Sequence, residues 1–130
     1  MKPTEIGVLI INFGEPDEPT QEKVTPFLER IFLQNSGLEP GQEAISRAKK
    51  LAEDRAPGLI EEYESIGGSP LNEQARHQSD LLEAELRSRG LEATTYEAYQ
   101  FTEPSIISAV QKARADGVDH LIALPVYPIC

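Results

Sequence analysis

Cysteine is almost absent from this chain of 130 residues, because Cys130 is the only one. A single cysteine excludes a disulfide within the chain, and it is typical of proteins that work in a reducing cytoplasm. The longest apolar run, around Gly7 to Ile11, is too short to span a membrane. No charged segment followed by an apolar stretch marks a secretory signal. We therefore predict a cytoplasmic protein without an integral membrane segment.

Basic residues are also scarce, with 12 Lys and Arg against 22 Asp and Glu and a net charge of −10. Because binding of a phosphate backbone needs a basic surface, this balance argues against nucleic acid as a partner. A small anionic ligand remains compatible, since a few local basic groups are enough for one. Neither GxxxxGK[ST] nor GxGxxG occurs, so the common phosphate-binding loops are missing.

Catalytic and metal-binding patterns are missing as well. The two histidines, His77 and His120, lie far apart and have no spacing typical of metal ligands. His77 is expected on the solvent side of its helix. No Ser-His-Asp or Cys-His arrangement can be assembled from this sequence. The residues themselves therefore predict no catalytic group and no metal ligand.

The order of apolar segments indicates the fold class. Three segments predict strands, and the amphipathic stretches between them predict helices. The expected strands are Glu5–Phe13, Ala93–Phe101 and His120–Val126. The expected helices are Thr20 or Thr25 to Leu33, Gln42–Glu53, Pro57–Ile66, Ser69–Arg89 and Pro104–Ala115. This order predicts an α/β layered domain with a parallel sheet and right-handed crossovers.

Ligands of such sheets bind beyond the carboxyl ends of the strands. Here those ends are Asn12-Phe13-Gly14, Tyr99-Gln100-Phe101 and Val126-Tyr127-Pro128, where polar and aromatic residues gather. The chain stops directly after the third expected strand, which is a poor place for a parallel sheet to end. We therefore expect residues 1–130 to form one α/β domain that is an incomplete part of a longer protein.

The segment from Tyr63 to Gln74 combines a glycine pair, a Ser-Pro step and the start of a long amphipathic pattern. Gly67 and Gly68 allow a positive φ and a close approach of the backbone to a ligand. Ser69 suits the N-cap of the coming helix and Pro70 suits its first turn. The free N–H groups of that turn then point at the glycines, which predicts a ligand held at a helix N-terminus.

Gln78 interrupts the apolar side of this helix. At about 100° per residue it falls on the stripe formed by Leu71, Ala75, Leu82 and Leu86. A buried amide needs hydrogen-bond partners. Two interpretations stay open: a structural hydrogen bond to a backbone group, or a polar group that lines a site beside the glycine loop.

Several of these segments together resemble the ferrochelatase family, whose pattern runs from N-[FYM]-G-x-P through Y-x-x-I-G-G-x-S-P-L to L-P-x-Y-P. The match covers essentially the whole chain, in order and at compatible spacing. The matching positions are Gly7–Pro16, Pro26–Leu28, Tyr63–Leu71, Gln78 and Leu124–Pro128. The loop departs from the pattern at one point, because Gly67-Gly68-Ser69 is one residue shorter than the commoner form.

The resemblance implies the N-terminal half of a two-domain lyase that inserts Fe²⁺ into a porphyrin in haem biosynthesis. It implies a porphyrin substrate bound between two similar α/β halves, with Phe13 in apolar contact on the metal-facing side of the ring. Ser69 and Gln78 match polar residues that line the porphyrin pocket, and Tyr63 also matches. Whether the substrate is protoporphyrin or coproporphyrin is left open.

The family's metal-facing histidine and its partner glutamate belong to the second half, beyond Cys130. We therefore predict no catalytic residue in this chain and no chelatase activity from it alone. Iron is implied as a substrate, and no cofactor is implied firmly. Some family members carry a ligand of an iron–sulfur cluster near this point, but Cys130 is here expected to be a lone thiol.

Two other functional classes remain alternatives. One is a non-catalytic module that binds a tetrapyrrole or another anion with the same loop. The other is a plain α/β interaction domain without a ligand.

Overall fold

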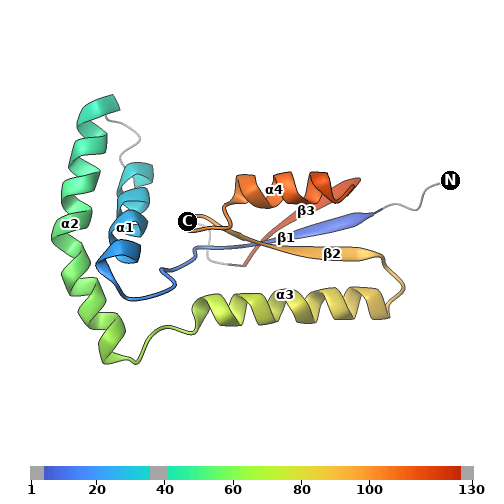
Figure 1. The fold of residues 1–130 in the computed structure, drawn as a ribbon. Coiled ribbons are helices and arrows are strands. Elements are labelled where there is room, and N and C mark those ends of the chain that lie inside the picture. The colour runs from blue at the N-terminus through green and yellow to red at the C-terminus, as the bar shows by residue number, and fades with distance from the viewer. Residues whose placement is uncertain (1–4, 36–40, 127–130) are drawn as a thin grey trace. The chain divides into compact units, whose positions relative to one another are not determined.

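The computed structural model of the chain describes residues 5–35 and 41–126. The chain divides into two compact units (Figure 1). The sheet unit comprises Met1–Gly14 and Leu71–Cys130, and the helical unit comprises Glu15–Pro70. Each unit is described by itself below.

The sheet unit is built on three parallel strands in the order β2-β1-β3. Strand β1 (Ile6–Asn12) lies in the centre, between β2 (Ala93–Tyr99) and β3 (His120–Pro125). The register places Asn12 beside Tyr99 and Ile11 beside Pro125. The apolar run of β1 is buried as a central parallel strand should be. The predicted α/β class with a parallel sheet is confirmed.

Two helices cover opposite faces of this sheet (Figure 1). Helix α3 (Leu71–Ser88) lies on one face, and the shorter helix α4 (Ile106–Ala115) lies on the other. Alternate strand residues supply the core beneath α4, since side chains along a strand point to opposite faces. This cluster consists of the strand residues Leu9, Ile11, Tyr96 and Ala98 together with Ala109 and Ala113 of α4. None of the helices in the described ranges is long and apolar enough to cross a membrane.

The helical unit consists of α1 (Gln21–Asn35) and α2 (Gly41–Ser65), which pack against each other. The sequence predicted two short helices in place of α2, and that prediction is wrong because α2 continues through Pro57. Alanines at every fourth position present one buried face from residue 44 to residue 56, immediately before the proline. These alanines are Ala44, Ala48, Ala52 and Ala56. Pro57 itself is exposed, so its missing N–H falls on the solvent side and packing continues beneath it.

Tyr96 ties β2 to the end of α4. Its hydroxyl donates a hydrogen bond of 2.8 Å to Asp116 Oδ2, one residue past the helix. Burial, this hydrogen bond and the nearby carboxylates of Asp116, Glu5 and Glu83 raise the pKa of Tyr96 to about 12 from 10.0. Folding therefore favours the neutral phenol, and this contribution to stability is present below pH 10 and is lost as the pH rises toward 12.

Substitution of Tyr96 by phenylalanine tests this linkage. We expect the free energy of unfolding to fall by about 1 kcal/mol at pH 8, the net worth of one hydrogen bond. Above pH 10, wild-type stability should decline more steeply than that of Tyr96→Phe, because only the wild type must ionise a phenol with a raised pKa. Urea unfolding of the intact protein at several pH values measures both effects. Equal slopes for the two proteins above pH 10 would contradict the linkage.

Candidate functional site

The carboxyl ends of the strands meet at one edge of the sheet unit. The backbone N–H groups of Gln100 and Phe101 donate to the carbonyls of Asn12 and Phe13 at 2.9 and 3.1 Å. These bonds continue the parallel pairing of β1 with β2 beyond the strands themselves. On the other side, Val126 N donates to Ile11 O at 3.0 Å. The predicted edge is therefore present, while Tyr127 and Pro128 lie outside the described residues.

An aromatic pair lies at this edge. The rings of Phe13 and Phe101 have centroids 5.3 Å apart and are inclined by 31°. Phe101 is only 4% exposed, whereas Phe13 is 43% exposed. The separation lies within the usual range for favourable aromatic contacts. The sequence named Phe13 as a candidate, and the structure adds the buried ring against it.

Gly14 follows Phe13 in a backbone conformation that only glycine adopts without strain, with φ of +84°. A Cβ at this position would overlap Thr102 Oγ1 and come within 3.0 Å of Tyr99 Cβ. The backbone of residue 14 therefore lies directly against the end of β2. This close approach requires glycine at position 14.

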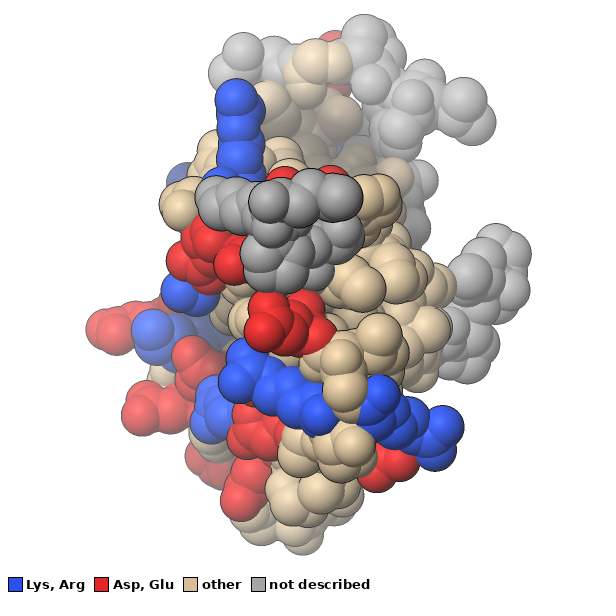
Figure 2. All heavy atoms as spheres, turned by 90° about the vertical axis from the view of Figure 1, so that its right-hand side faces the viewer, with Lys and Arg blue, Asp and Glu red and all other residues tan. Residues whose placement is uncertain are grey.

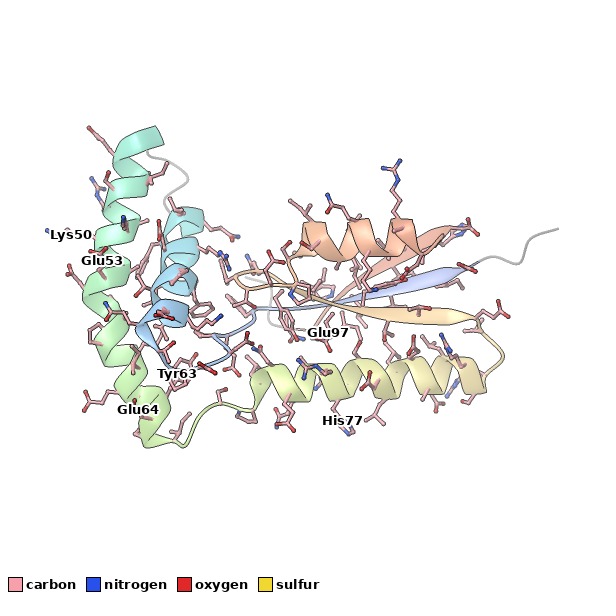
Figure 3. All side chains as sticks on the ribbon, in the orientation of Figure 1. Lys50, Glu53, Tyr63, Glu64, His77 and Glu97 are labelled. Carbon is pink, nitrogen blue, oxygen red and sulfur yellow. The ribbon has the colours of Figure 1, made fainter. Side chains whose placement is uncertain are left out.

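A polar chain links the same end of β2 to α3. The Tyr99 hydroxyl donates to Glu97 Oε2 at 3.2 Å, and Arg76 Nε lies 3.4 Å from Glu97 Oε1. Glu97 projects from β2 toward α3 (Figure 3). Arg76 is largely exposed, so this ion pair contributes little energy but limits where the Glu97 carboxylate can lie.

The glycine pair has a structural role at the end of α2 that the sequence did not predict. Gly67 N donates to Glu64 O at 3.1 Å, and Gly68 N donates to Tyr63 O at 2.9 Å. Both glycines have positive φ, and the two bonds form the Schellman motif that ends α2. A Cβ at either glycine would meet nothing within 4 Å, so no close backbone approach explains them in the described structure. Helix α3 then begins at Leu71, with Ser69 and Pro70 exposed before it.

Gln78 is exposed, so the expectation that it lies within the buried stripe of α3 is wrong. The buried residues of this helix are Ala75 and Ser79. Thr95 Oγ1 of β2 donates to the Ser79 carbonyl at 3.0 Å, so β2 lies against α3 at this residue. This contact turns Gln78 to the flank of the helix. Its proposed contact with a ligand stays a prediction.

Tyr63 lies near the C-terminal end of α2 in the helical unit (Figure 3). Partial burial and the negative charge of Glu15 raise the pKa of Tyr63 above 10.0. Glu15 is itself buried, which is unusual for a carboxylate. Tyr63 and Ser69 thus belong to the helical unit, whereas Phe13 and Gln78 belong to the sheet unit.

Histidines and acidic side chains form no metal centre in the part of the chain that the structure describes. His77 is exposed and points away from the sheet, as predicted (Figure 3). His120 is also exposed, at the start of β3. Cys130 lies outside the described residues, so the structure does not test its suggested link to an iron–sulfur cluster.

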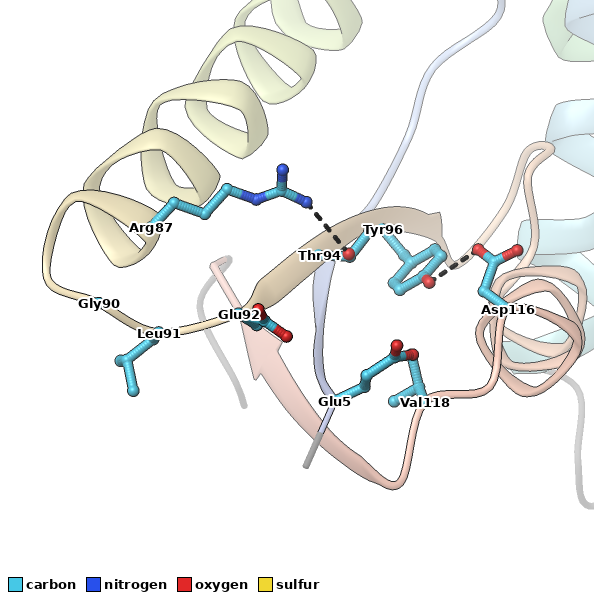
Figure 4. Close-up of a pocket in the computed structure, with 9 residues that line it drawn as sticks. All are labelled: Glu5, Arg87, Gly90, Leu91, Glu92, Thr94, Tyr96, Asp116 and Val118. Carbon is cyan, nitrogen blue, oxygen red and sulfur yellow. Dashed lines mark hydrogen bonds between the residues drawn. The ribbon is translucent and has the colours of Figure 1, made fainter. Parts of the chain in front are cut away.

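A hollow of about 640 Å³ opens at the opposite edge of the sheet unit, where the strands begin (Figure 4). Its lining includes Arg87, Tyr96 and the carboxylates of Glu5, Glu92 and Asp116. Acidic and basic side chains are interleaved on the side of the molecule that faces the viewer in Figure 2. The sequence did not predict this hollow, because its residues come from three separate stretches of the chain, at 5, 87–96 and 116–118, without a shared motif.

Comparison with known proteins gives one consistent family. The family described as Ferrochelatase matches residues 5–130. A ferrochelatase of Gloeobacter violaceus is 36% identical over 129 residues, which cover 95% of this chain and 38% of that protein. A ferrochelatase of Parasynechococcus marenigrum is 36% identical over 128 residues, with 96% and 32% covered. The chain thus spans about a third of the length of these curated relatives.

Proposed function

The chain belongs to the ferrochelatase family, and from this premise we propose that it forms the N-terminal part of a cytoplasmic porphyrin metallochelatase. The complete enzyme would be a lyase of haem biosynthesis that inserts ferrous iron into a porphyrin. Iron would be its substrate and not a resident cofactor. The single observation that supports this most strongly is the family match over residues 5–130.

Phe13 is the central residue of the proposed porphyrin site. Its ring carries no metal-ligating atom, so it would contribute apolar contact to the face of the macrocycle and exclude water there. Its exposure of 43% leaves ring surface for such a contact. The position just beyond a central parallel strand is where α/β sheets bind ligands.

Three further polar or aromatic side chains are proposed as porphyrin contacts because they match the family pattern. Ser69 and Gln78 would donate hydrogen bonds to the porphyrin or its carboxylates, and both are exposed. Tyr63 would present a phenol that stays neutral well above physiological pH, because its pKa is raised. A neutral hydroxyl donates a hydrogen bond to a carboxylate without charge repulsion.

Iron insertion also requires the two pyrrole N–H protons to leave the ring. A histidine with a pKa near neutrality, assisted by a carboxylate, suits this transfer. We propose that the histidine and the carboxylate come from a C-terminal half, whereas this chain orients the porphyrin ring. We therefore propose that the chain by itself has no chelatase activity.

The proposed C-terminal half would pack beside β3. All six residues of β3 are exposed, although it pairs with the central strand along its inner edge. The outer edge of β2 is different: Glu83 Oε1 accepts from Thr95 N, and Arg87 Nε donates to Ala93 O, each at 3.1 Å. Side chains of α3 thus occupy the backbone groups of β2 that a further strand would need. This asymmetry favours β3 as the side on which the fold continues.

Titration of the intact protein with a dicarboxylic or tetracarboxylic porphyrin tests the proposed site. We expect a red-shifted Soret band for the wild type. The double variant Ser69→Ala, Gln78→Ala should bind about 5- to 150-fold more weakly, because two hydrogen bonds are lost at about 0.5–1.5 kcal/mol each.

The matched control removes the same two groups elsewhere, in the double variant Ser46→Ala, Gln111→Ala, and both of these residues are exposed. It should bind like the wild type. If the protein that includes the proposed C-terminal half binds porphyrin but inserts no iron, the non-catalytic tetrapyrrole module is favoured. No spectral change for the intact wild type would contradict the proposed site.

A further inference from the structure

Phe101 is the buried member of the aromatic pair at the carboxyl edge of the sheet unit. We propose that Phe101 is a positioning residue, which holds the Phe13 ring in the orientation that contacts the porphyrin. This inference rests on the proposed function. Phe101 was predicted from the sequence to lie at a strand end, and no role was assigned to it there.

Backbone contacts fix the two aromatic residues relative to each other. Phe101 N donates to Phe13 O, and Gln100 N donates to Asn12 O on the preceding residue. Asn12 is buried, and Gly14 lies against Tyr99 and Thr102, so the chain is held on both sides of Phe13. The Cα positions of the pair are therefore determined by the sheet and not by the rings.

The rings then contact each other from these fixed positions. With a centroid separation of 5.3 Å and an inclination of 31°, Phe101 covers one side of the Phe13 ring. Phe13 is still 43% exposed. A ring that is already restricted on one side loses less freedom when a flat ligand covers its other side. Phe101 thus acts on the ligand only through Phe13.

A variant that removes the ring of Phe101 but keeps an apolar side chain tests whether the ring itself positions Phe13. Phe101→Leu should weaken porphyrin binding about three- to tenfold, which corresponds to the usual strength of an aromatic pair. Phe101→Tyr retains the ring face and should bind within about twofold of the wild type, well below a tenfold change. Phe27→Leu is the matched control, because Phe27 is a buried phenylalanine of the helical unit. It should leave the affinity unchanged.

Fluorine NMR of the intact protein labelled with 4-fluorophenylalanine reads the position of Phe13 without a ligand. The Phe13 resonance is identified by its loss in Phe13→Leu. It should shift in Phe101→Leu, because the ring current of the neighbour is removed, and it should stay in place in Phe27→Leu. An unshifted Phe13 resonance in Phe101→Leu would overturn the inference.

The two measurements also separate this inference from the proposed function. If Phe13→Ala weakens porphyrin binding and Phe101→Leu does not, positioning by Phe101 is refuted and the porphyrin site stands. If the wild type binds no porphyrin at all, the proposed function fails and the positioning role fails with it, whatever the fluorine spectrum shows. Retained binding in Phe101→Tyr, together with the loss in Phe101→Leu, supports the inference.

Discussion

Replacement of Gly14 by alanine is expected to lower the free energy of unfolding by about 2–4 kcal/mol. An alanine at φ of +84° is strained by about 1–2 kcal/mol. Its Cβ would also overlap Thr102 Oγ1 and crowd Tyr99, so β2 or the chain after Phe13 must shift. Urea unfolding of the intact protein, followed by circular dichroism, measures the loss.

Gly58→Ala is the matched control for this substitution. Gly58 lies inside α2, has no positive φ, and a Cβ there meets nothing within 4 Å. Because alanine is the better helix former by about 0.5–1 kcal/mol, this variant should be at least as stable as the wild type. Equal stability of Gly14→Ala and Gly58→Ala would show that the contact of residue 14 with β2 has no energetic importance.

Truncation of Leu9 to alanine is expected to have the other large effect, a loss of about 2–5 kcal/mol. Leu9 lies in the middle of the central strand, is 3% exposed, and belongs to the cluster beneath α4. Its removal forfeits apolar burial and leaves a cavity between sheet and helix, which the rigid backbone of three paired strands closes poorly. The same unfolding measurement reports the change.

The control here is Leu81→Ala on α3, where the same atoms are removed from a side chain that is 57% exposed. Alanine favours the helix slightly, so the change should stay within about 0.5 kcal/mol of zero. A similar loss in both leucine variants would mean that Leu81 is covered in the intact protein by residues outside the described structure.

Local patterns predicted the elements of the sheet unit well. The unbroken apolar run of β1 indicated a buried parallel strand, and the structure places it at the centre of the sheet. The helix predicted over Pro104–Ala115 is present as α4, although it begins two residues later, at Ile106. Ser105 accepts from Ser108 N at 3.1 Å as its N-cap, and Gly117 follows the helix with φ of +85°. Such signals depend on a few adjacent residues, so one sequence contains them completely.

Predictions that depended on a packing partner were less successful. Pro57 indicated a helix boundary, but the packing of α1 against the alanine face of α2 outweighs the loss of one hydrogen bond. The stripe that included Gln78 differed from the buried face by one residue, because β2 contacts α3 at Ser79. A helix pattern gives the width of an apolar face, whereas the partner decides which flank of it is buried.

In the candidate site too, local features were predictable from the sequence and contacts between distant residues were not. Phe13 could be predicted as a site residue from its place after a buried strand. The loop with Gly67 and Gly68 could be predicted from its local sequence. The ring contact with Phe101 joins residues 88 positions apart, from 101 − 13, and no local pattern encodes it. The use of Gly67 and Gly68 to end α2 likewise became apparent only from their hydrogen bonds to Tyr63 and Glu64.

By itself, the sequence determined the fold class, the order of the strands along the chain and the family. These follow from the spacing of apolar residues and from motifs whose members lie close together in the chain. Only the tertiary structure decided that β1 is central, that Ser79 and not Gln78 faces the sheet, and that Phe101 lies against Phe13. The physical reason is that these features depend on the register between surfaces that are distant in sequence, and packing selects that register only when the chain has folded.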